Sequence, residues 1–455
     1  MGLLRPGMHI HLIGIGGAGL SAIARVLHGW GYRVSGSDRQ ASALTEALAA
    51  EGIAVSIGHR AGQAAGADLV VVSSAIPADN PEVVEARQRG LPVVKRERFL
   101  ADLTANKRVL AVAGTHGKTT TTAMIAWILL QAGLDPTFIV GGVLQNLGTN
   151  ARAGDGPYFV IEADEYDRAF LGLRPTVAVI TALEHDHPDC YPTFAQMRQA
   201  FVAFVGQVVA EGRLILCGEA EEARRLGEAV DRPAETYGLD PAWDWWASGE
   251  ELGRSSTFAV WRGDRRLGDC ALQLPGRHNV LNALAALATS AQAGVAFDVA
   301  AAALTRFRGT ERRFEVKGQA AGVVVVDDYA HHPTEVRATL AAARLKYPGR
   351  RIWAVFQPHT YSRTAALLDD FARAFDEADR VIVTPIYAAR EAAMPGVTGA
   401  VLAARLEHPD VRAVGSLTEA SEMLRREVEP GDLVITLGAG DGYRIGEELL
   451  ARLEG

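Results

Sequence analysis

Residues 108–120 read RVLAVAGTHGKTT, an apolar strand followed by a glycine-rich turn and the start of a helix. Gly117, Lys118 and Thr119 are typical of the phosphate-binding end of a P-loop. Backbone N–H groups there surround the phosphates, the lysine meets the β- and γ-phosphate oxygens, and the threonine hydroxyl meets Mg²⁺. The full pattern has a glycine six residues before the lysine, where this chain has Val112. A solvated lysine in a turn is the alternative, but the position between a strand and a helix favours ATP or GTP binding.

Residues 14–19, GIGGAG, form a second glycine-rich turn, between a predicted strand over 9–14 and a predicted helix over 18–30. Glycines let the backbone approach a pyrophosphate, and the helix N-terminus offers free N–H groups and a partial positive charge. Asp38 ends the next predicted strand, where NAD-binding proteins carry an acid that meets a ribose hydroxyl. The pattern indicates a nucleotide diphosphate. NAD, another diphosphate and a tight turn without a ligand all remain open.

Two acidic clusters follow predicted strands downstream of the P-loop. Residues 162–165 read EADE after the apolar run 158–161, and residues 184–187 read EHDH after the strand 177–181. Oxygen donors suit Mg²⁺, and a nearby histidine nitrogen serves as a ligand or as a base. Most acidic strand ends are simply solvated loops, but two such clusters beside a P-loop predict a metal–phosphate site.

The last third of the chain places polar clusters after four predicted strands, at residues 327–335, 357–363, 387–391 and 438–441. The carboxyl ends of parallel strands share one edge of a sheet, so we expect these clusters to converge. The adjacent His331 and His332 suggest zinc, but no third ligand at a familiar spacing accompanies them. The following Pro-Thr-Glu is equally typical of a helix start.

Alternating strands and helices predict three consecutive α/β domains, over residues 1–104, 105–311 and 312–455. The tract 231–268, rich in Trp and charge, predicts short antiparallel strands. The Ala-rich segment 280–304 is interrupted by polar residues, so it predicts buried helices and not a membrane span.

The composition of the 455 residues, 48% hydrophobic and 22% charged, is that of an ordinary globular protein. Lys and Arg total 46 against 54 Asp and Glu, a net charge of −8, which argues against a surface built for nucleic acid. Three scattered cysteines are too few for a disulfide framework and fit a reducing compartment. Without the pattern of a signal peptide, we expect a soluble, cytoplasmic protein.

The order of the motifs resembles the Mur ligases, the ATP-dependent amide-forming enzymes of peptidoglycan precursor synthesis. The resemblance spans residues 10–441 and rests on GIGGAG, AGTHGKTTT, EADE, DH, GRHNVLNALAA, FRGTERRFE, DDYAHHPTE, QPHTYSRT and GAGD. Within the family, the motifs are most similar to the branch that attaches L-alanine to UDP-N-acetylmuramate. The recycling branch, which attaches a murein tripeptide, is the alternative, because EADEYD at 162–167 resembles it. An NAD-linked oxidoreductase and a P-loop switch or binding module are alternatives from other classes.

The resemblance implies a Rossmann-like first domain for the UDP-sugar, a P-loop ATPase-like central domain and a Rossmann-like third domain that brings the amino acid and closes over the second. It implies ATP, Mg²⁺ (or Mn²⁺), UDP-N-acetylmuramate and L-alanine as ligands, and a monomer or weak homodimer. The UDP-sugar would meet Gly14, Gly16, Gly17, Gly19, Asp38 and Ser73. ATP would meet Gly114, Thr115, His116, Gly117, Lys118, Thr119, Thr120, His278, Asn279 and Asn282. Thr119, Glu162 and His187 would hold the metal, and Tyr329, His359 and Arg363 the substrate. Lys118, His187, Arg312, Arg313, His331 and His332 are the predicted catalytic residues.

Overall fold

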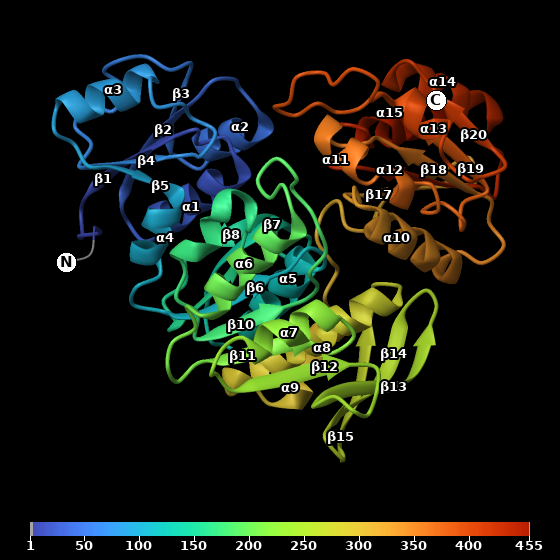
Figure 1. The fold of residues 1–455 in the computed structure, drawn as a ribbon, viewed down its shortest axis with the longest axis horizontal. Coiled ribbons are helices and arrows are strands. Elements are labelled where there is room, and N and C mark those ends of the chain that lie inside the picture. Colours follow the sequence, from blue (N-terminus) through green and yellow to red (C-terminus); the bar gives the residue numbers. More distant parts are fainter. Residues whose placement is uncertain (1–2, 455) are drawn as a thin grey trace.

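The computed structural model describes residues 3–454, which form three sheets in chain order, each with covering helices (Figure 1). The first sheet has the order β3-β2-β1-β4-β5 and is parallel throughout. Every residue of β1 is buried, as expected for a central strand of a sheet covered on both faces. Its strands are β1 (His9–Ile13), β2 (Arg33–Asp38), β3 (Ala54–Ile57), β4 (Leu69–Val72) and β5 (Val93–Lys95), and its helices are α1 (Ala18–Gly29), α2 (Ala43–Ala50), α3 (Pro81–Gln88) and α4 (Arg96–Leu103).

The middle sheet has ten strands in the order β15-β14-β13-β12-β11-β10-β6-β9-β7-β8. Its strands are β6 (Arg108–Ala113), β7 (Thr137–Leu144), β8 (Thr149–Arg152), β9 (Tyr158–Glu162), β10 (Val177–Ile180), β11 (Arg213–Cys217), β12 (Ala234–Gly238), β13 (Trp245–Leu252), β14 (Ser256–Arg262) and β15 (Arg265–Leu272). The helices are α5 (Lys118–Gln131), the 3₁₀ segment η1 (Tyr166–Gly172), α6 (Phe194–Val205), α7 (Glu221–Glu228), α8 (Arg277–Gln292) and α9 (Phe297–Thr305).

The tract 231–268 extends this middle sheet. The prediction of antiparallel strands is right for β13–β15, but it is wrong for β12, which pairs in parallel with β11. Trp245 is buried and Trp246 stacks on Trp261, so the tryptophans pack the added strands on both faces. The Ala-rich segment forms α8 and α9, and α8 packs on α5. Within residues 3–454, every helix is too short or too polar to span a bilayer.

The third sheet has the order β16-β17-β21-β18-β19-β20, with only the edge strand β16 antiparallel to its neighbour. Its strands are β16 (Glu315–Ala320), β17 (Val323–Asp328), β18 (Ile352–Phe356), β19 (Arg380–Val383), β20 (Val411–Ala413) and β21 (Leu433–Leu437). The helices are α10 (Pro333–Lys346), α11 (Tyr361–Ala366), α12 (Leu368–Phe371), α13 (Gly399–Ala403), α14 (Leu417–Glu427) and α15 (Tyr443–Glu454). The predicted fold class of three consecutive α/β units is confirmed.

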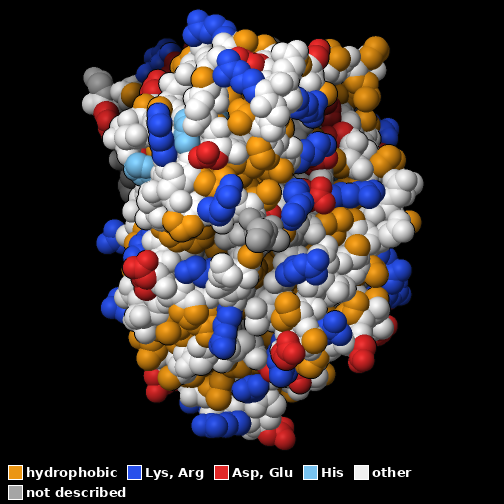
Figure 2. All heavy atoms as spheres, turned by 90° about the vertical axis from the view of Figure 1, so that its left-hand side faces the viewer, with side chains coloured by type: hydrophobic (Ala, Val, Ile, Leu, Met, Phe, Trp, Pro, Cys, Tyr) orange, Lys and Arg blue, Asp and Glu red, His pale blue; other side chains and the backbone are white. Residues whose placement is uncertain are grey.

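The hydrophobic core is divided unevenly among the three units. One cluster joins the first and middle units, with side chains from α1, α4, β7 and η1. The third unit has clusters of its own on the two faces of its sheet. On the face shown in Figure 2, basic side chains are scattered singly among acidic, polar and apolar ones.

Candidate functional site

The turn between β6 and α5 has the backbone conformation of a phosphate-binding loop. Gly114 has φ +134° and Gly117 has φ +78°, a region that favours glycine. A Cβ on Gly114 would lie 2.2 Å from Oγ1 of Thr181, so this position excludes any side chain. Val112 is buried within β6, which shows that Gly114 is the first glycine of this turn. The departure from the full P-loop pattern therefore leaves the turn itself intact.

Lys118, the first residue of α5, makes an ion pair with a buried carboxylate. Its Nζ lies 2.7 Å from Oε1 of Glu165, and Nε2 of His187 lies 3.5 Å from the same oxygen. Burial alone lowers the pKa of Lys118, but Glu165 and Glu162 outweigh it and raise the pKa. Burial also lowers the pKa of His187, and the carboxylates of Asp186 and Glu165 again outweigh it. For both side chains, the neighbouring carboxylates therefore outweigh the cost of burying the charged form.

Glu162 and Thr119 place oxygen atoms side by side at the end of β9 and the start of α5. Glu162 accepts the N–H of Gly141 at 2.7 Å, and the side chain of Thr119 is close enough to lower the pKa of Glu162. Burial raises the pKa of Glu162 in spite of the nearby Lys118. A desolvated carboxylate beside a hydroxyl fits a hard divalent cation, which prefers oxygen ligands. His187, the third predicted metal ligand, lies instead beside the carboxylates of Glu165 and Asp186, and Glu165 also pairs with Lys118.

A cavity of about 400 Å³ lies between the middle and third units beside this turn. Apolar side chains of Leu274, Leu281 and Phe314 line part of it, which suits a flat base better than a phosphate chain. The cavity brings together eight of the predicted residues, from both units: His116, Gly117, Thr119, Thr120, His278, Asn279, Asn282 and Arg313.

The two asparagines of α8 brace the P-loop. Oδ1 of Asn282 accepts the hydroxyl of Thr121 at 3.2 Å, and its Nδ2 donates to Oδ1 of Asn279. A Cβ on Gly117 would lie 2.5 Å from Oδ1 of Asn282, so the amide packs directly on the turn. Burial lowers the pKa of His278 to about 4, which keeps this ring neutral.

Arg312 and Arg313 follow the linker into the third unit and point in different directions. Arg312 donates to Asp327 at 2.9 Å and to the carbonyl oxygen of Gly438 at 2.8 Å, so its guanidinium is engaged within the third unit. Arg313 lines the cavity and lies 3.7 Å from Glu335. Of these two predicted catalytic arginines, Arg313 is therefore the one that faces the cavity.

The first turn of α10 makes polar contacts across the cavity to the middle unit. Thr334 donates its hydroxyl to Oε2 of Glu184 at 2.7 Å, and Glu335 lies 3.3 Å from Nδ1 of His116. Glu335 also accepts the backbone N–H of His332, as the acid of a capping box does. The carboxylates of Glu184 and Glu335 outweigh the effect of burial and raise the pKa of His116 to about 9.

A buried ion pair joins α11 to the loop after β10. Nε of Arg363 lies 2.7 Å from Oδ1 of Asp186, and both side chains are 4% exposed. Arg363 also donates to Nδ1 of His359 at 3.0 Å. His331 lies beside His359 and contacts the backbone oxygen of Tyr329 at 2.9 Å. Burial lowers the pKa of His331 to about 3 and that of His359 to about 4, so both rings are neutral.

The glycine turn of the first unit is held by the acid that the sequence singles out. Oδ2 of Asp38 accepts the N–H of Gly16 at 2.9 Å, and a Cβ on Gly16 would clash with this carboxylate. Gly14 has φ +87° and packs on Ser73. A Cβ on Gly17 would meet only the carbonyl oxygen of Gly14, at 3.3 Å. The carbonyl oxygen of Gly17 accepts the N–H of Ser21 in the first turn of α1. Asp38 therefore holds the backbone of the glycine turn by this hydrogen bond to Gly16.

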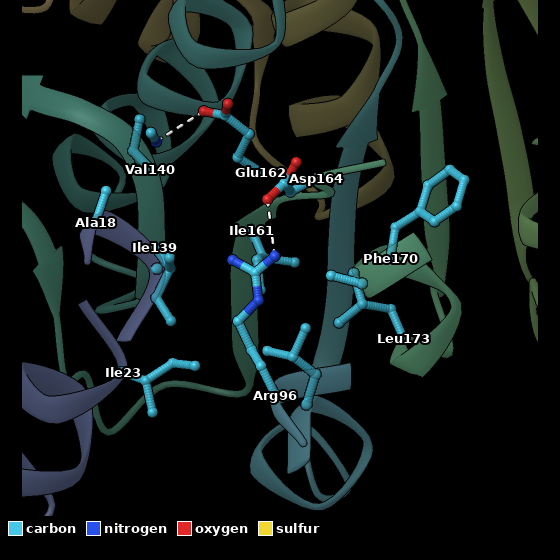
Figure 3. Close-up of a pocket in the computed structure, with 14 residues that line it drawn as sticks. Ala18, Ile23, Arg96, Ile139, Val140, Ile161, Glu162, Asp164, Phe170 and Leu173 are labelled. Carbon is cyan, nitrogen blue, oxygen red and sulfur yellow. Dashed lines mark hydrogen bonds and ion pairs between the residues drawn. The ribbon is translucent and has the colours of Figure 1, made fainter. Parts of the chain in front are cut away.

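Gly19 lines a second cavity, of about 120 Å³, between the first and middle units (Figure 3). A Cβ on Gly19 would lie 2.3 Å from Nη1 of Arg96, so the guanidinium occupies the space beside α1. Arg96 pairs with Asp164 at 2.8 Å, and Glu162 lines the same cavity. Figure 3 shows Arg96, Asp164 and Glu162 in line. The cavity thus leads from the glycine turn to the candidate metal residues.

Three family models match the chain in order: the Mur ligase family, catalytic domain over residues 9–108, the Mur ligase middle domain over 112–290 and the Mur ligase, glutamate ligase domain over 312–440. A UDP-N-acetylmuramate–L-alanine ligase of Roseiflexus sp. (strain RS-1) is 47% identical over 98% of this chain and 99% of its own. The chain belongs to the Mur ligase family.

Other relatives extend the comparison. A UDP-N-acetylmuramate–L-alanine ligase of Geobacter sp. (strain M21) is 45% identical over 98% of this chain and 97% of its own. The crystal structure of the UDP-N-acetylmuramate-alanine ligase MurC of Thermotoga maritima superposes with a TM-score of 0.83 at 30% identity, covering 98% of this chain and 99% of its own. A murein peptide ligase from Psychrobacter arcticus 273-4 gives 0.72 at 28% identity, with 99% of each chain covered.

Five further residues contact predicted site residues although the prediction does not include them: Arg96, Glu165, Glu184, Asp186 and Glu335. The four acids lie inside the polar clusters that follow predicted strands, so the sequence does indicate the segments in which they lie. Which acid of a cluster turns inward depends on the loop conformation, which the pattern does not give. Arg96 stands in no motif, and only the packing of α4 on the middle unit reveals it.

Proposed function

We propose that this Mur ligase joins L-alanine to the carboxylate of UDP-N-acetylmuramate and converts ATP to ADP and phosphate. The observation that carries the proposal is the cavity in which the P-loop turn of the middle unit faces Arg313 of the third. Relatives that are 44–47% identical over nearly the whole chain bear the name UDP-N-acetylmuramate–L-alanine ligase, which supports L-alanine as the amino acid. Membership of this family accounts for both glycine-rich turns, so the NAD-linked oxidoreductase and the P-loop switch are no longer needed to explain them.

The first step is transfer of the γ-phosphoryl group to the sugar carboxylate. A carboxylate acylates amines poorly because its oxide does not leave, whereas an acyl phosphate releases phosphate readily. Two anions must approach each other in this step, so fixed positive charge is needed where they meet. Lys118, kept protonated by its acidic neighbours, and Arg313, which lines the cavity, supply it.

Mg²⁺ (or Mn²⁺) is the metal that we propose for Thr119 and Glu162. His187 is either its third ligand or, unbound, the base of the second step. The hydroxyl of Thr119 and the carboxylate of Glu162 suit the ion, whereas His187 lies beside Glu165 and Asp186. Once bound, the ion would neutralise phosphate charge. The cavity in Figure 3 gives the sugar a path from the glycine turn to Glu162.

The second step is attack of the alanine amine on the acyl phosphate. We propose that His187 accepts the amine proton, since Asp186 and Glu165 make this ring more basic than an ordinary histidine. His331, His359 and Tyr329 are proposed to hold the amino acid by hydrogen bonds, because burial keeps both rings neutral. Arg363 is already engaged by Asp186 and His359, so we propose that it orients His359 and His187.

The recycling reaction with a murein tripeptide is the second candidate. Tyr166, the residue that resembles the recycling branch, lies edge-on to His187 and under the guanidinium of Arg390, beside the proposed amino-acid site. A bulky ring at that position affects how large an amine substrate the site admits.

Phosphate release tests the proposal. We expect release only when UDP-N-acetylmuramate, L-alanine and ATP are all present, and near-complete loss of it in Lys118→Ala. Replacing L-alanine with the tripeptide, with ATP and UDP-N-acetylmuramate still present, distinguishes the two reactions. Phosphate release with the tripeptide but not with L-alanine would contradict the choice of alanine. The monomer or weak homodimer and the cytoplasmic location stay predictions, and sedimentation at several concentrations tests the first.

A further inference from the structure

We propose that His116, Glu184 and His332 form a binding site for Zn²⁺ or a similar divalent metal ion. This site is distinct from the magnesium site proposed at Glu162. His116 belongs to the P-loop turn, Glu184 follows β10, and His332 is the residue before α10. One ligand atom from each lies within 4.8 Å of the others. Two ligands thus come from the middle unit and the third from the last unit.

The distances between these side chains match the edges of a small tetrahedron. Zinc bonds of about 2.0–2.1 Å at tetrahedral angles place neighbouring ligand atoms about 3.3 Å apart. Nε2 of His116 lies 3.3 Å from Oε2 of Glu184, and Nδ1 of His332 lies 3.6 Å from the same oxygen. The ligand atoms of His116 and His332 lie within 4.8 Å of each other, so an ion would draw these two rings closer together.

Further polar groups orient these ligands as the outer partners of metal sites do. Oε1 of Glu335 lies 3.3 Å from Nδ1 of His116, the ring nitrogen that would not face the ion. A carboxylate at that position fixes the tautomer and makes the ligating nitrogen more basic. The hydroxyl of Thr334 donates to Oε2 of Glu184 at 2.7 Å and holds that carboxylate in place.

The ring of His332 is buried with incomplete hydrogen bonding, and Nδ1 is the nitrogen that lies 3.6 Å from Glu184. His332 is 4% exposed, and its Nε2 has no hydrogen-bond partner among residues 3–454. Nδ1 accepts only the backbone N–H of Thr334, at 3.3 Å, a long bond that an ion at Nδ1 would replace. The ring lies 4.6 Å from that of His116, centroid to centroid. Desolvating an imidazole without pairing both nitrogens costs free energy unless a ligand engages the ring.

The chemistry of the three groups selects the kind of ion. Two imidazoles and one carboxylate suit zinc, whereas magnesium prefers oxygen ligands alone. Three protein ligands leave a fourth position open. His116 and Glu184 both line the cavity between the middle and third units, and the Glu184 side chain is 42% exposed, which gives an ion access. The ligands lie 68 and 148 residues apart in sequence, so no spacing motif reveals them.

Cobalt(II) is the probe that tests the site, because tetrahedral Co²⁺ absorbs visible light far more strongly than octahedral Co²⁺. We titrate Co²⁺ into the whole chain with excess Mg²⁺, without ATP, and expect the strong band to saturate at one equivalent. Added Zn²⁺ should abolish it. His332→Gln and His116→Gln, which remove a ligand from different units, should each abolish the band, and circular dichroism checks that both remain folded.

Glu162→Gln is the matched control, because it alters the proposed magnesium site and should keep the band. A weak octahedral spectrum from the unaltered chain would overturn the proposal, as would a full-strength band in either folded histidine variant. The readout needs neither ATP nor turnover, so failure here leaves the ligase proposal untouched.

Discussion

The middle unit meets its two neighbours through interfaces of opposite chemistry. Toward the first unit, Ile23 and Leu100 share one apolar cluster with Ile139 and Phe170. Toward the third unit the contacts are polar, such as Thr334 with Glu184, Glu335 with His116 and Arg363 with Asp186. Apolar burial favours one fixed arrangement, whereas a hydrogen bond exchanged with water contributes only about 0.5–1.5 kcal/mol net. The polar interface is therefore the one suited to open and close around substrates.

Truncating a shared apolar side chain should have the largest effect on stability. Phe170 is fully buried and stacks on Phe204 with ring centroids 4.8 Å apart. We expect Phe170→Ala to lower the free energy of unfolding by about 3–5 kcal/mol. Because the cluster spans two units, hydrogen exchange should quicken in both the first and the middle unit.

Phe371→Ala is the matched control, since Phe371 lies in a cluster of the third unit alone. Its faster exchange should stay within residues 312–454. If Phe170→Ala loosens the middle unit and leaves the first unit protected, the two do not share a core.

Removing the charge of Asp186 should weaken the polar interface. Asp186→Asn leaves the guanidinium of Arg363 buried with a weaker partner, and a hydrogen bond to a charged group contributes about 1.5–3 kcal/mol. We expect the third unit to separate, so the radius of gyration from small-angle scattering should rise while the melting temperature changes little.

Asp369→Asn is the comparison, because its ion pair with Arg405 is exposed and contributes less than about 1 kcal/mol. It should leave the radius of gyration unchanged. An Asp186→Asn protein as compact as the unaltered chain would show that other contacts hold the third unit.

A third, smaller effect belongs to the first unit, away from both interfaces. Glu82 is fully buried and lies 2.8 Å from His11 and 2.8 Å from His59. Burial raises its pKa, but hydrogen bonds from His11, Ser37 and His59 outweigh this and bring the pKa below 4.5. The folded form therefore binds the proton less tightly than the unfolded form does, and the stabilisation is present above pH 4.5 and lost on acidification.

We expect the difference in melting temperature between the unaltered chain and Glu82→Gln to shrink as the pH falls below about 4.5. Glu46→Gln, at an exposed position of α2, should show no such trend. A difference that grows on acidification would mean that the folded-state pKa is raised.

The sequence predicts the parts of the fold that carry strong local patterns. The central strands β1, β6 and β17 are apolar runs, and the predicted strands match them within a residue or so. The edge strands β3 and β20 are missing from the prediction, because they are half-exposed and lack an apolar run. Their place is decided by pairing with a neighbour and not by their own residues.

The site is predicted only in part for a similar reason. The P-loop turn and the polar strand ends follow from motifs, and the cavity brings many of them together. The sequence leaves Arg312 and Arg313 equivalent, whereas the structure turns Arg312 back to Asp327 and Arg313 toward the cavity. Contacts such as Glu335 with His116 join residues more than 200 positions apart, and only the docking of the third unit creates them.

The delivery of Arg313 into the ATP cavity by the third unit is the central claim, and steady-state kinetics of Arg313→Ala tests it most directly. A fixed cation that meets charge developing in the transition state typically contributes about 10²–10³-fold in kcat. We predict a loss of that size in phosphate release, while ATP binding to the P-loop, followed by equilibrium titration, changes by less than about tenfold. A variant that turns over at the original rate would contradict the account.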